Sequence, residues 1–536
     1  MNFMLTQMEE VLGVPQILDM IEAEGEFLKS VKKDNLTGYS EDLYDNYYLP
    51  IHYKYLEQTM EQLSADKSKL KTLLELLAAI PNLEFPIHKN IKILTVHQLY
   101  EIKEYVYYYN QLYYFLEKQK WLDLFDNLKD LTEFFEILDP EGFGLPIFVI
   151  SSAYSDEIGD ILNKQLKLLQ ELKESYNQLL ERAKKELQIP YLKDSFTVSR
   201  SETELADRII HSPYFVLTAE NVANYSFALA DDEHCLELKK KISNLQEKLE
   251  AEERYVLQEL TDIYREWESD IFLSWLSLRR GAWKILLSNF AFKYNCCIPV
   301  VWRKKAIIIK KAINLPLKQH LESMGRKYQP IDYEFSGSVS LLTGPNMGGK
   351  TTVLKTIGQF CTLLHYGIPL PCESAELPIF KHIWYNQSET DNNADLSSFG
   401  REVVSFTQAI QQSGTNLFLL DEFARGTNPT EGELLVSAVL QYLATTKNMS
   451  IAATHFTAPT MLPKVTQYSI AGLDLDKIKA QNPKDANERL KILNEAMDYS
   501  IKRLKKNEAP PLNAINVARI LGMPEEVLKY TEIKEK

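Results

Sequence analysis

The chain has 536 residues, a net charge of −14 at pH 7 and a pI near 5.3. This length exceeds one ordinary hydrophobic core, so we expect two to four domains, and the acidic balance means that nucleic-acid binding would need a local basic patch. The five cysteines show no Cys-x-x-Cys spacing, which favours a reducing compartment. The acidic N-terminus lacks an apolar core, and we find no run of about 18 apolar residues. We therefore expect a cytoplasmic protein with no signal peptide and no membrane contact.

Residues 1–150 are predicted to form a helical core domain. Apolar residues follow helical spacing from Leu70 to Leu77 and again from Leu99 to Leu116. The tyrosines of the second stretch are more typical of helix packing than of a platform for stacking bases. The segment Pro140–Pro146 contains two glycines and two prolines, which predicts a loop at the domain boundary.

Two long helices are predicted next, a first lever helix over 151–187 and a second over 233–284. The apolar seam expected on the first consists of Leu162, Leu166, Leu169, Leu172, Tyr176, Leu179, Ala183 and Leu187. The seam expected on the second consists of Leu238, Ile242, Leu245, Leu249, Val256, Leu260, Ile263 and Trp267. Two such seams cover one another in an antiparallel pair. Strand-like runs at 195–199, 214–217 and 225–229 predict a small β-containing tip over 188–232.

The motif with the clearest chemistry has the P-loop pattern Gly344-x4-Gly349-Lys350-Thr351, between an apolar run and a helix-compatible run. Glycines let backbone N–H groups converge on phosphate oxygens, and the helix that follows presents its positive end to the same anion. Lys350 would reach the β- and γ-phosphates of ATP, and Thr351 would ligate Mg²⁺. The predicted nucleotide-binding residues are Gly344, Pro345, Asn346, Met347, Gly348, Gly349, Lys350, Thr351 and Thr352.

A second motif, which ends in two acidic residues, follows in the same α/β region. Leu417–Leu420 is an apolar run that ends in Asp421 and Glu422, as a Walker B strand does. A parallel strand brings its last carboxylate to the sheet edge where a P-loop also lies. We expect Asp421 to hold the Mg²⁺ shell and Glu422 to orient or deprotonate the attacking water.

Three segments, 342–351, 421–428 and 453–455, resemble in order and spacing the ATPase domain of MutS proteins, a branch of the ABC-type ATPases. Ser397-Ser398-Phe399 is similar to the start of the MutS signature helix, and 513–522 to the C-terminal helical motif of that family. The resemblance covers roughly residues 285–530. The fold expected is an all-α core with paired lever helices, followed by an α/β P-loop ATPase domain over 285–475 and a C-terminal helical dimerisation motif over 476–536.

The resemblance also implies roles for single residues. Asn346 would contact phosphate, and His455 would be a catalytic switch histidine beside Glu422. Ser397 and Ser398 would reach the γ-phosphate held by another subunit, so a homodimer would share two sites. Tyr328 would stack on adenine. Taken alone, His455 is equally a core histidine, Ser397 a helix N-cap and Tyr328 a packing residue.

The client of the ATPase stays open between two hypotheses. Full-length MutS proteins begin with a mismatch-reading domain that carries a Phe-x-Glu wedge. The pattern Phe134-Phe-Glu136 lies in a predicted helix and is interpreted as coincidence, so we expect a short form without the mismatch reader.

One hypothesis is a DNA mismatch-repair-like or branched-DNA-binding ATPase whose dimer closure moves the lever helices. The alternative is a protein-remodelling ATPase, for example a reactivase of an adenosylcobalamin-dependent aminomutase, that does not bind DNA. The tip favours the alternative, because its three cations and seven acids give −4.

Overall fold

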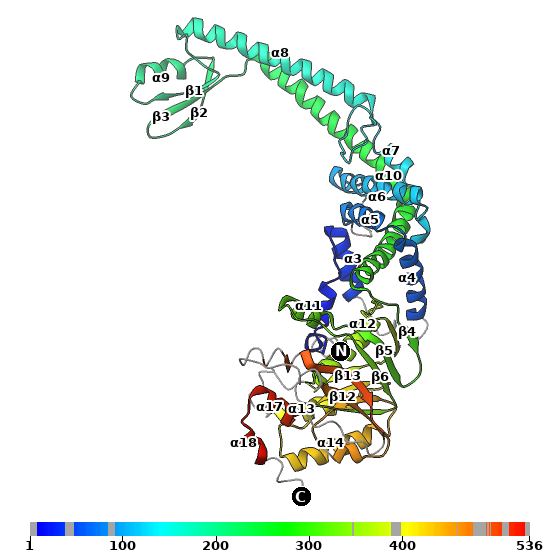
Figure 1. The fold of residues 1–536 in the computed structure, drawn as a ribbon. Coiled ribbons are helices and arrows are strands. Elements are labelled where there is room, and N and C mark those ends of the chain that lie inside the picture. The colour runs from blue at the N-terminus through cyan, green and yellow to red at the C-terminus, as the bar shows by residue number, and fades with distance from the viewer. Residues whose placement is uncertain are drawn as a thin grey trace. The chain divides into compact units, whose positions relative to one another are not determined.

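The computed structural model describes residues 8–37, 48–83, 92–345, 348–386, 398–456, 458–474, 489, 492–493, 495–505 and 514–530. Contacts divide the chain into two compact units (Figure 1). Unit 1 comprises Met1–Ala78 and Arg279–Lys536, and unit 2 comprises Ala79–Leu278. The region expected as one helical core, 1–150, is therefore divided between the two units. In the part of the chain described, no helix is both long and apolar enough to cross a membrane.

Unit 1 begins with the helices α2 (Val14–Asp19), α3 (Gly25–Thr37), α4 (Tyr48–Ser64) and α5 (Lys67–Ala79), the last ending at the unit boundary. Of these, α2 contacts α11 (Leu315–Ser323) and α12 (Lys350–His365), and α4 contacts β4 (Val300–Trp302). Leu12 lies against Gly358, where an added Cβ would come within 2.6 Å of the leucine side chain. Gln359 Nε2 donates a 2.6 Å hydrogen bond to the Leu12 carbonyl. Both contacts hold the helix that contains residues 358 and 359 in place.

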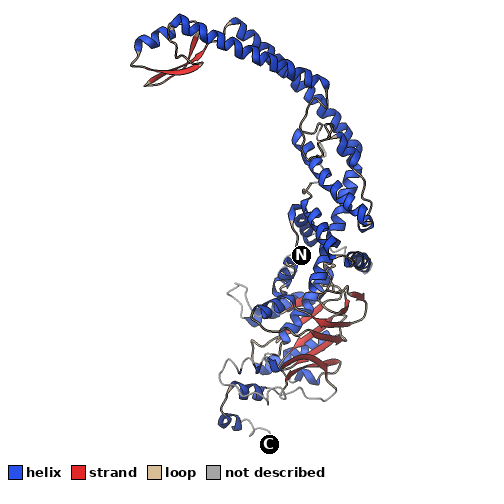
Figure 2. Cartoon of the chain, turned by 45° about the horizontal axis from the view of Figure 1, so that its top comes forward, coloured by secondary structure: helices blue, strands red, loops and turns tan. Residues whose placement is uncertain are grey.

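Two sheets form the centre of unit 1. In Figure 2 the strands fall into two groups: one group contains these two sheets, and the other is a small sheet in unit 2. The first sheet has the order β4-β8-β5-β6 and the second β13-β12-β7-β11-β10-β9. In the second sheet β12, β7, β11, β10 and β9 are parallel and β13 is antiparallel. The strand bounds are β4 (Val300–Trp302), β5 (Ala306–Ala312), β6 (Ile331–Ser336), β7 (Val339–Thr343), β8 (Ser374–Pro378), β9 (Ile383–Tyr385), β10 (Leu417–Asp421), β11 (Met449–Ala453), β12 (Val465–Leu473) and β13 (Met497–Arg503).

The helices of this part are α11 (Leu315–Ser323), α12 (Lys350–His365), α13 (Ser398–Ile410), α14 (Pro429–Leu443), α17 (Ala514–Leu521) and α18 (Glu525–Leu528), with a 3₁₀ turn η3 (Ala458–Met461). Because β7 and β10 are buried along nearly their whole length, they read as continuous apolar runs, as central parallel strands do. The segment expected as a helical motif, 476–536, also contains the strand β13. Its alternation Met497-Asp-Tyr-Ser-Ile501 has the period of two of a strand, and it pairs with β12.

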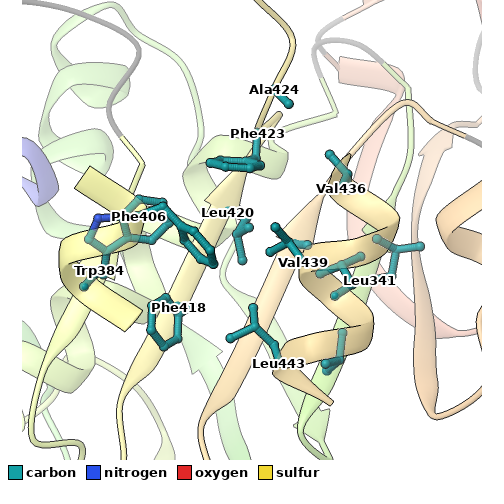
Figure 3. Packing of buried hydrophobic residues seen from close by; sticks show 14 residues of the cluster. Leu341, Trp384, Phe406, Phe418, Leu420, Phe423, Ala424, Val436, Val439 and Leu443 are labelled. Atoms are coloured by element: carbon teal, nitrogen blue, oxygen red, sulfur yellow. The ribbon is translucent and has the colours of Figure 1, made fainter. Parts of the chain in front are cut away.

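An aromatic cluster fixes α13 against the large sheet (Figure 3). The rings of Trp384, Phe406, Phe418 and Phe423 lie with neighbouring centroids 5.4 to 6.4 Å apart. The Trp384 indole also donates a 2.9 Å hydrogen bond to Ser405 of α13. Such pairs stabilise packing beyond the area they bury, so α13 is tied to the strands that end in the site.

Unit 2 consists of helices and one small sheet. Its elements are α6 (Val96–Gln119), the 3₁₀ turn η2 (Leu122–Leu124), α7 (Thr132–Ile137), α8 (Asp156–Leu187), β1 (Ser195–Ser199), α9 (Thr203–Ile210), β2 (Phe215–Glu220), β3 (Asn224–Leu229) and the first part of α10 (Glu233–Tyr294). The sheet has the order β1-β3-β2 and is antiparallel. Three strands were expected here, and three are present. The fold class is confirmed: a helical region with long helices precedes a mixed α/β region.

The seam of α8 differs in part from the prediction. Leu179 and Ala183 are buried as expected, but Leu162, Leu166 and Leu169 are exposed by 44%, 57% and 47%. The buried face of this half begins at Ile158 and Ile161 instead. Successive helical residues are about 100° apart, so a seam that starts one residue earlier turns the three leucines away from it.

Candidate nucleotide site

Four parallel strands bring the predicted motifs to one edge of the large sheet. The neighbours β7, β11, β10 and β9 all run in the same direction, so their carboxyl ends lie together. The P-loop follows β7, His455 follows β11, and Asp421 and Glu422 end β10. Side chains separated by more than one hundred residues therefore meet at the edge where open α/β sheets bind ligands.

Two glycines of the P-loop are needed for its shape. Gly349 caps α12 with φ of 84°, in the left-handed region that favours glycine. A Cβ on Gly348 would lie 2.8 Å from the Pro345 carbonyl oxygen, closer than side chains are found. The turn therefore keeps the backbone bare at the start of a 16-residue helix, the arrangement that receives an anion.

Lys350 is buried at the first position of α12 and points back across the turn. Its Nζ donates hydrogen bonds to the carbonyls of Gly344, at 2.9 Å, and Pro345, at 3.2 Å. Burial lowers the pKa of Lys350, and the nearby carboxylates of Glu422 and Asp421 act in the opposite direction. The structure thus brings together the lysine and both acids that the sequence predicted.

Other predicted P-loop residues are placed less completely. Thr351 lies exposed in the first turn of α12, and the half-buried Thr352 accepts a 2.7 Å hydrogen bond from Thr356 Oγ1 through its carbonyl. Asn346 and Met347 lie outside the described residues. Their roles stay predictions.

Asp421 is held in position by the neighbouring strand β9. The Tyr385 hydroxyl donates a 2.9 Å hydrogen bond to Asp421 Oδ2. The Asn386 side chain forms two hydrogen bonds with the Asp421 backbone. Its Nδ2 donates to the Asp421 carbonyl at 2.8 Å, and its Oδ1 accepts from the Asp421 N–H. One carboxylate oxygen of Asp421 is therefore tied to Tyr385, while among the described residues no side chain bonds Oδ1, an oxygen of the kind that ligates Mg²⁺.

Glu422 leaves the strand in a left-handed turn, with φ of 52° at Glu422 and 62° at Ala424. Non-glycine residues rarely adopt this conformation, and such strain concentrates at functional sites. His455 Nε2 lies 2.5 Å from Glu422 Oε1, and Arg425 contacts Oε2. His455, predicted as a switch histidine, is thus in direct contact with the predicted catalytic acid.

Glu402 of α13 is a site residue that the sequence analysis missed. The residue is 9% exposed, and its carboxylate accepts hydrogen bonds from the Ala424 N–H at 2.9 Å and from Asn386 Nδ2 at 2.6 Å. Burial raises the pKa of Glu402, while both hydrogen bonds lower it. One buried acid therefore links α13, the end of β9 and the turn after Glu422.

Two aromatic residues lie near this region. The Tyr328 hydroxyl accepts a 2.9 Å hydrogen bond from the Asn314 N–H, which holds the tyrosine beside α11. Its stacking on adenine stays a prediction. Tyr499 of β13 was not predicted, and a Cβ on Gly349 would lie 3.4 Å from its ring.

The predicted signature serines fall at the edge of the described chain. Ser397 lies outside it, and Ser398 is the first residue of α13, with only its backbone described. Their contact with a second subunit stays a prediction.

The fold and the edge site together define a P-loop nucleotide-binding domain. Comparison with known proteins identifies its type: the MutS domain V family matches residues 340–536. This C-terminal part of the chain is therefore similar to MutS domain V, which is an ATPase domain.

The similar curated proteins include several named Endonuclease MutS2. One from Caldicellulosiruptor saccharolyticus is 32% identical over 229 residues, 41% of this chain and 28% of the relative. One from Caldicellulosiruptor bescii is 27% identical over 366 residues, 67% of this chain and 44% of the relative. One from Lactococcus lactis subsp. cremoris is 26% identical over 303 residues, 54% and 36% respectively. The chain thus spans less than half the length of each of these relatives.

Proposed function

We propose that this protein binds and hydrolyses ATP and uses the cycle to move the paired helices of unit 2. The observation that carries the proposal is the meeting of Lys350, Asp421 and Glu422 at one sheet edge. Lys350 binds phosphate, Asp421 and Thr351 hold Mg²⁺, and Glu422 orients the attacking water. The Mg²⁺ ion, when bound, neutralises charge on the phosphates.

A homodimer is part of the proposal. The resemblance of Ser397-Ser398-Phe399 to the MutS signature segment implies that these serines reach the nucleotide of another subunit. Each site of this protein would then be completed by a second copy. Long helices that continue between the two units, as α10 does, supply a route by which closure changes the position of the tip.

DNA is the first candidate client, and a lysine-lined groove between α8 and α10 supports it. The groove has a volume of about 430 Å³ and a floor of Leu168 and Leu245. Its rim carries Lys164, Lys167, Lys241 and Lys248 against the single acid Glu171, so four cations and one acid give +3. Within the described residues, none of these four lysines forms an ion pair with a carboxylate. Unpaired lysines that flank a groove can bind the phosphate backbone of DNA, whereas the acidic tip would repel it.

The test is salt-dependent binding of branched duplex DNA to the purified full chain. We expect Lys167→Glu with Lys241→Glu to weaken binding at least about tenfold and to reduce the salt slope by about 2, since each phosphate contact contributes about 0.9. The matched control is Lys185→Glu with Arg254→Glu, which makes the same charge change on exposed sites of the same two helices. No DNA binding by the unchanged protein at low salt would remove this candidate.

A protein client is the second candidate, and the tip favours it. Two of the three tip cations are already engaged: Arg200 pairs with Glu220, and Arg208 donates to the Leu187 carbonyl. The exposed Val216 and Leu217 of β2 offer apolar contact instead. A protein that hydrolyses ATP but fails to bind DNA at low salt would support this candidate over the first.

A further inference from the structure

A pair of cysteines outside the nucleotide site lies within reach of bond formation. Cys297 follows the end of α10, and Cys372 lies between α12 and β8. Their sulfur atoms are 3.3 Å apart. The backbone holds this approach, because Cys297 and Leu370 exchange two hydrogen bonds, of 2.8 and 2.9 Å.

The two thiols differ in exposure and in the direction of their pKa shifts. Cys297 is half-buried, whereas Cys372 is 3% exposed. The hydrogen bond between them lowers the pKa of Cys297 against the effect of burial, and it raises the pKa of Cys372. Burial raises the pKa of the neighbouring Cys296 well above its usual value. Since the thiolate is the reactive form, Cys297 is the group that an oxidant meets first.

We propose that Cys297 and Cys372 are a reversible oxidation site that forms a disulfide with hydrogen peroxide or another hydroperoxide. The Cys297 thiolate attacks one peroxide oxygen, the O–O bond breaks, and hydroxide leaves and takes a proton to form water. The sulfenic acid at Cys297 is then attacked by Cys372 sulfur, which forms the S–S bond and releases a second water. Two thiols and one hydrogen peroxide thus give one disulfide and two waters.

The bond would join two segments that matter to the ATPase. Cys297 and Cys372 are 75 residues apart, and the loop between them contains β7, the P-loop and α12. A disulfide would tie the segment after α10 to the segment after α12. This consequence rests on the proposed function, and we expect the tie to slow ATP turnover by restraining motion between these helices.

The first experiment is chemical and does not depend on ATPase activity. The full chain is treated with hydrogen peroxide, its remaining thiols are alkylated under denaturing conditions, and its peptides are mapped by mass spectrometry. We expect two of the five thiols to be lost, a Cys297–Cys372 cross-linked peptide, and recovery of both thiols with dithiothreitol. Cys297→Ser and Cys372→Ser should each abolish the cross-link, whereas Cys296→Ser should retain it.

Other products overturn the proposal. A Cys296–Cys297 disulfide, or only sulfinic or sulfonic acid at Cys297, means that Cys372 does not act as the partner. In the second experiment, turnover of oxidised protein is compared with that of reduced protein and of Cys297→Ser. A cross-link that leaves turnover unchanged contradicts the restraint. A reduced protein without ATPase activity contradicts the proposed function, while the peptide map still decides whether the disulfide forms.

Discussion

Glu422, which we propose activates the attacking water, is held by two donors in a strained turn, and these contacts do not involve the P-loop. His455 contacts one oxygen of the Glu422 carboxylate, and Arg425 contacts the other. An interaction that fixes a general base before substrate arrives lowers the cost of orienting it in the transition state. The roles proposed for Glu422 and Lys350 should therefore be separable by mutation.

Glu422→Gln is expected to keep ATP binding and to lower turnover by about 100-fold or more, because the amide cannot accept the proton of water. Lys350→Ala should instead abolish ATP binding. Both are measured by fluorescent-nucleotide titration and phosphate release, with Glu431→Gln, an exposed acid of α14, as the control. Full turnover in Glu422→Gln would show that another group is the base.

Glu402→Gln is expected to lower turnover while ATP affinity changes little. The carboxylate accepts from both Asn386 and Ala424, and an amide can accept on only one side, so the turn after Glu422 loosens. We expect about 1 to 3 kcal/mol of lost stability from the buried donor left without a partner. Steady-state kinetics separate the effect on kcat from the effect on KM. If Glu402→Gln lost ATP binding as much as turnover, the site as a whole would be disrupted, and the expectation would be wrong.

The sequence was informative about residues joined by fixed local spacing. Lys350, Asp421, Glu422 and His455 each follow a strand or turn directly, so strand order alone brings them together. Asn386 and Glu402 act through hydrogen bonds to backbone atoms of a distant turn. No spacing rule connects them to that turn, so only the structure identifies them.

At the scale of elements, one buried ion pair holds α6 to the loop at the predicted domain boundary. Lys103 Nζ lies 2.9 Å from Asp139 Oδ1, and their side chains are 3% and 6% exposed. The Gly144 N–H donates a 2.7 Å hydrogen bond to Asp139 Oδ2. The glycine-rich segment that appeared to be only a boundary is therefore anchored by the helix before it.

Lys103→Met is expected to lower the free energy of unfolding by about 3 kcal/mol, because it leaves a buried carboxylate without its cation. Burial raises the pKa of Asp139, but the hydrogen bonds from Lys103 and Gly144 outweigh it and leave the pKa below its usual value. A lowered carboxyl pKa stabilises the fold above the unfolded value of about 3.9, and this stabilisation is lost as pH falls through the folded pKa. Denaturant unfolding at neutral pH and at a pH below the folded pKa of Asp139 checks this, with the exposed Lys118→Met as control. A loss that is equally large in acid would contradict the ion-pair explanation.

Element boundaries show where periodicity succeeds and where it fails. The sequence predicts the central strands β7 and β10 directly, because each is a short apolar run next to a turn motif. In α8, Ile161 and Leu162 are adjacent apolar residues, so two seams fit the sequence and only packing against a partner decides between them. The strand β13 was not predicted, because its alternation of apolar and polar residues is weak. The region that contains it was expected to be helical because of the resemblance alone.

At the scale of the whole molecule, the chain crosses between its two units twice, at the end of α5 and within the 62-residue helix α10. Helices transmit displacement because their backbone hydrogen bonds resist bending. The central claim of the proposed function is that the nucleotide bound in unit 1 changes the position of the tip in unit 2.

The most direct test places one spin label on each tip of the proposed dimer. Val222 lies between β2 and β3 and is 97% exposed, so Val222→Cys accepts a label without disturbing the core. The background is Glu422→Gln, which holds ATP, with Cys296 and Cys297 changed to serine. Double electron–electron resonance then measures the distance between the two labels with and without ATP and Mg²⁺. The account predicts two different distance distributions; one unchanged distribution, or no coupling between labels in a preparation that binds ATP, would contradict it.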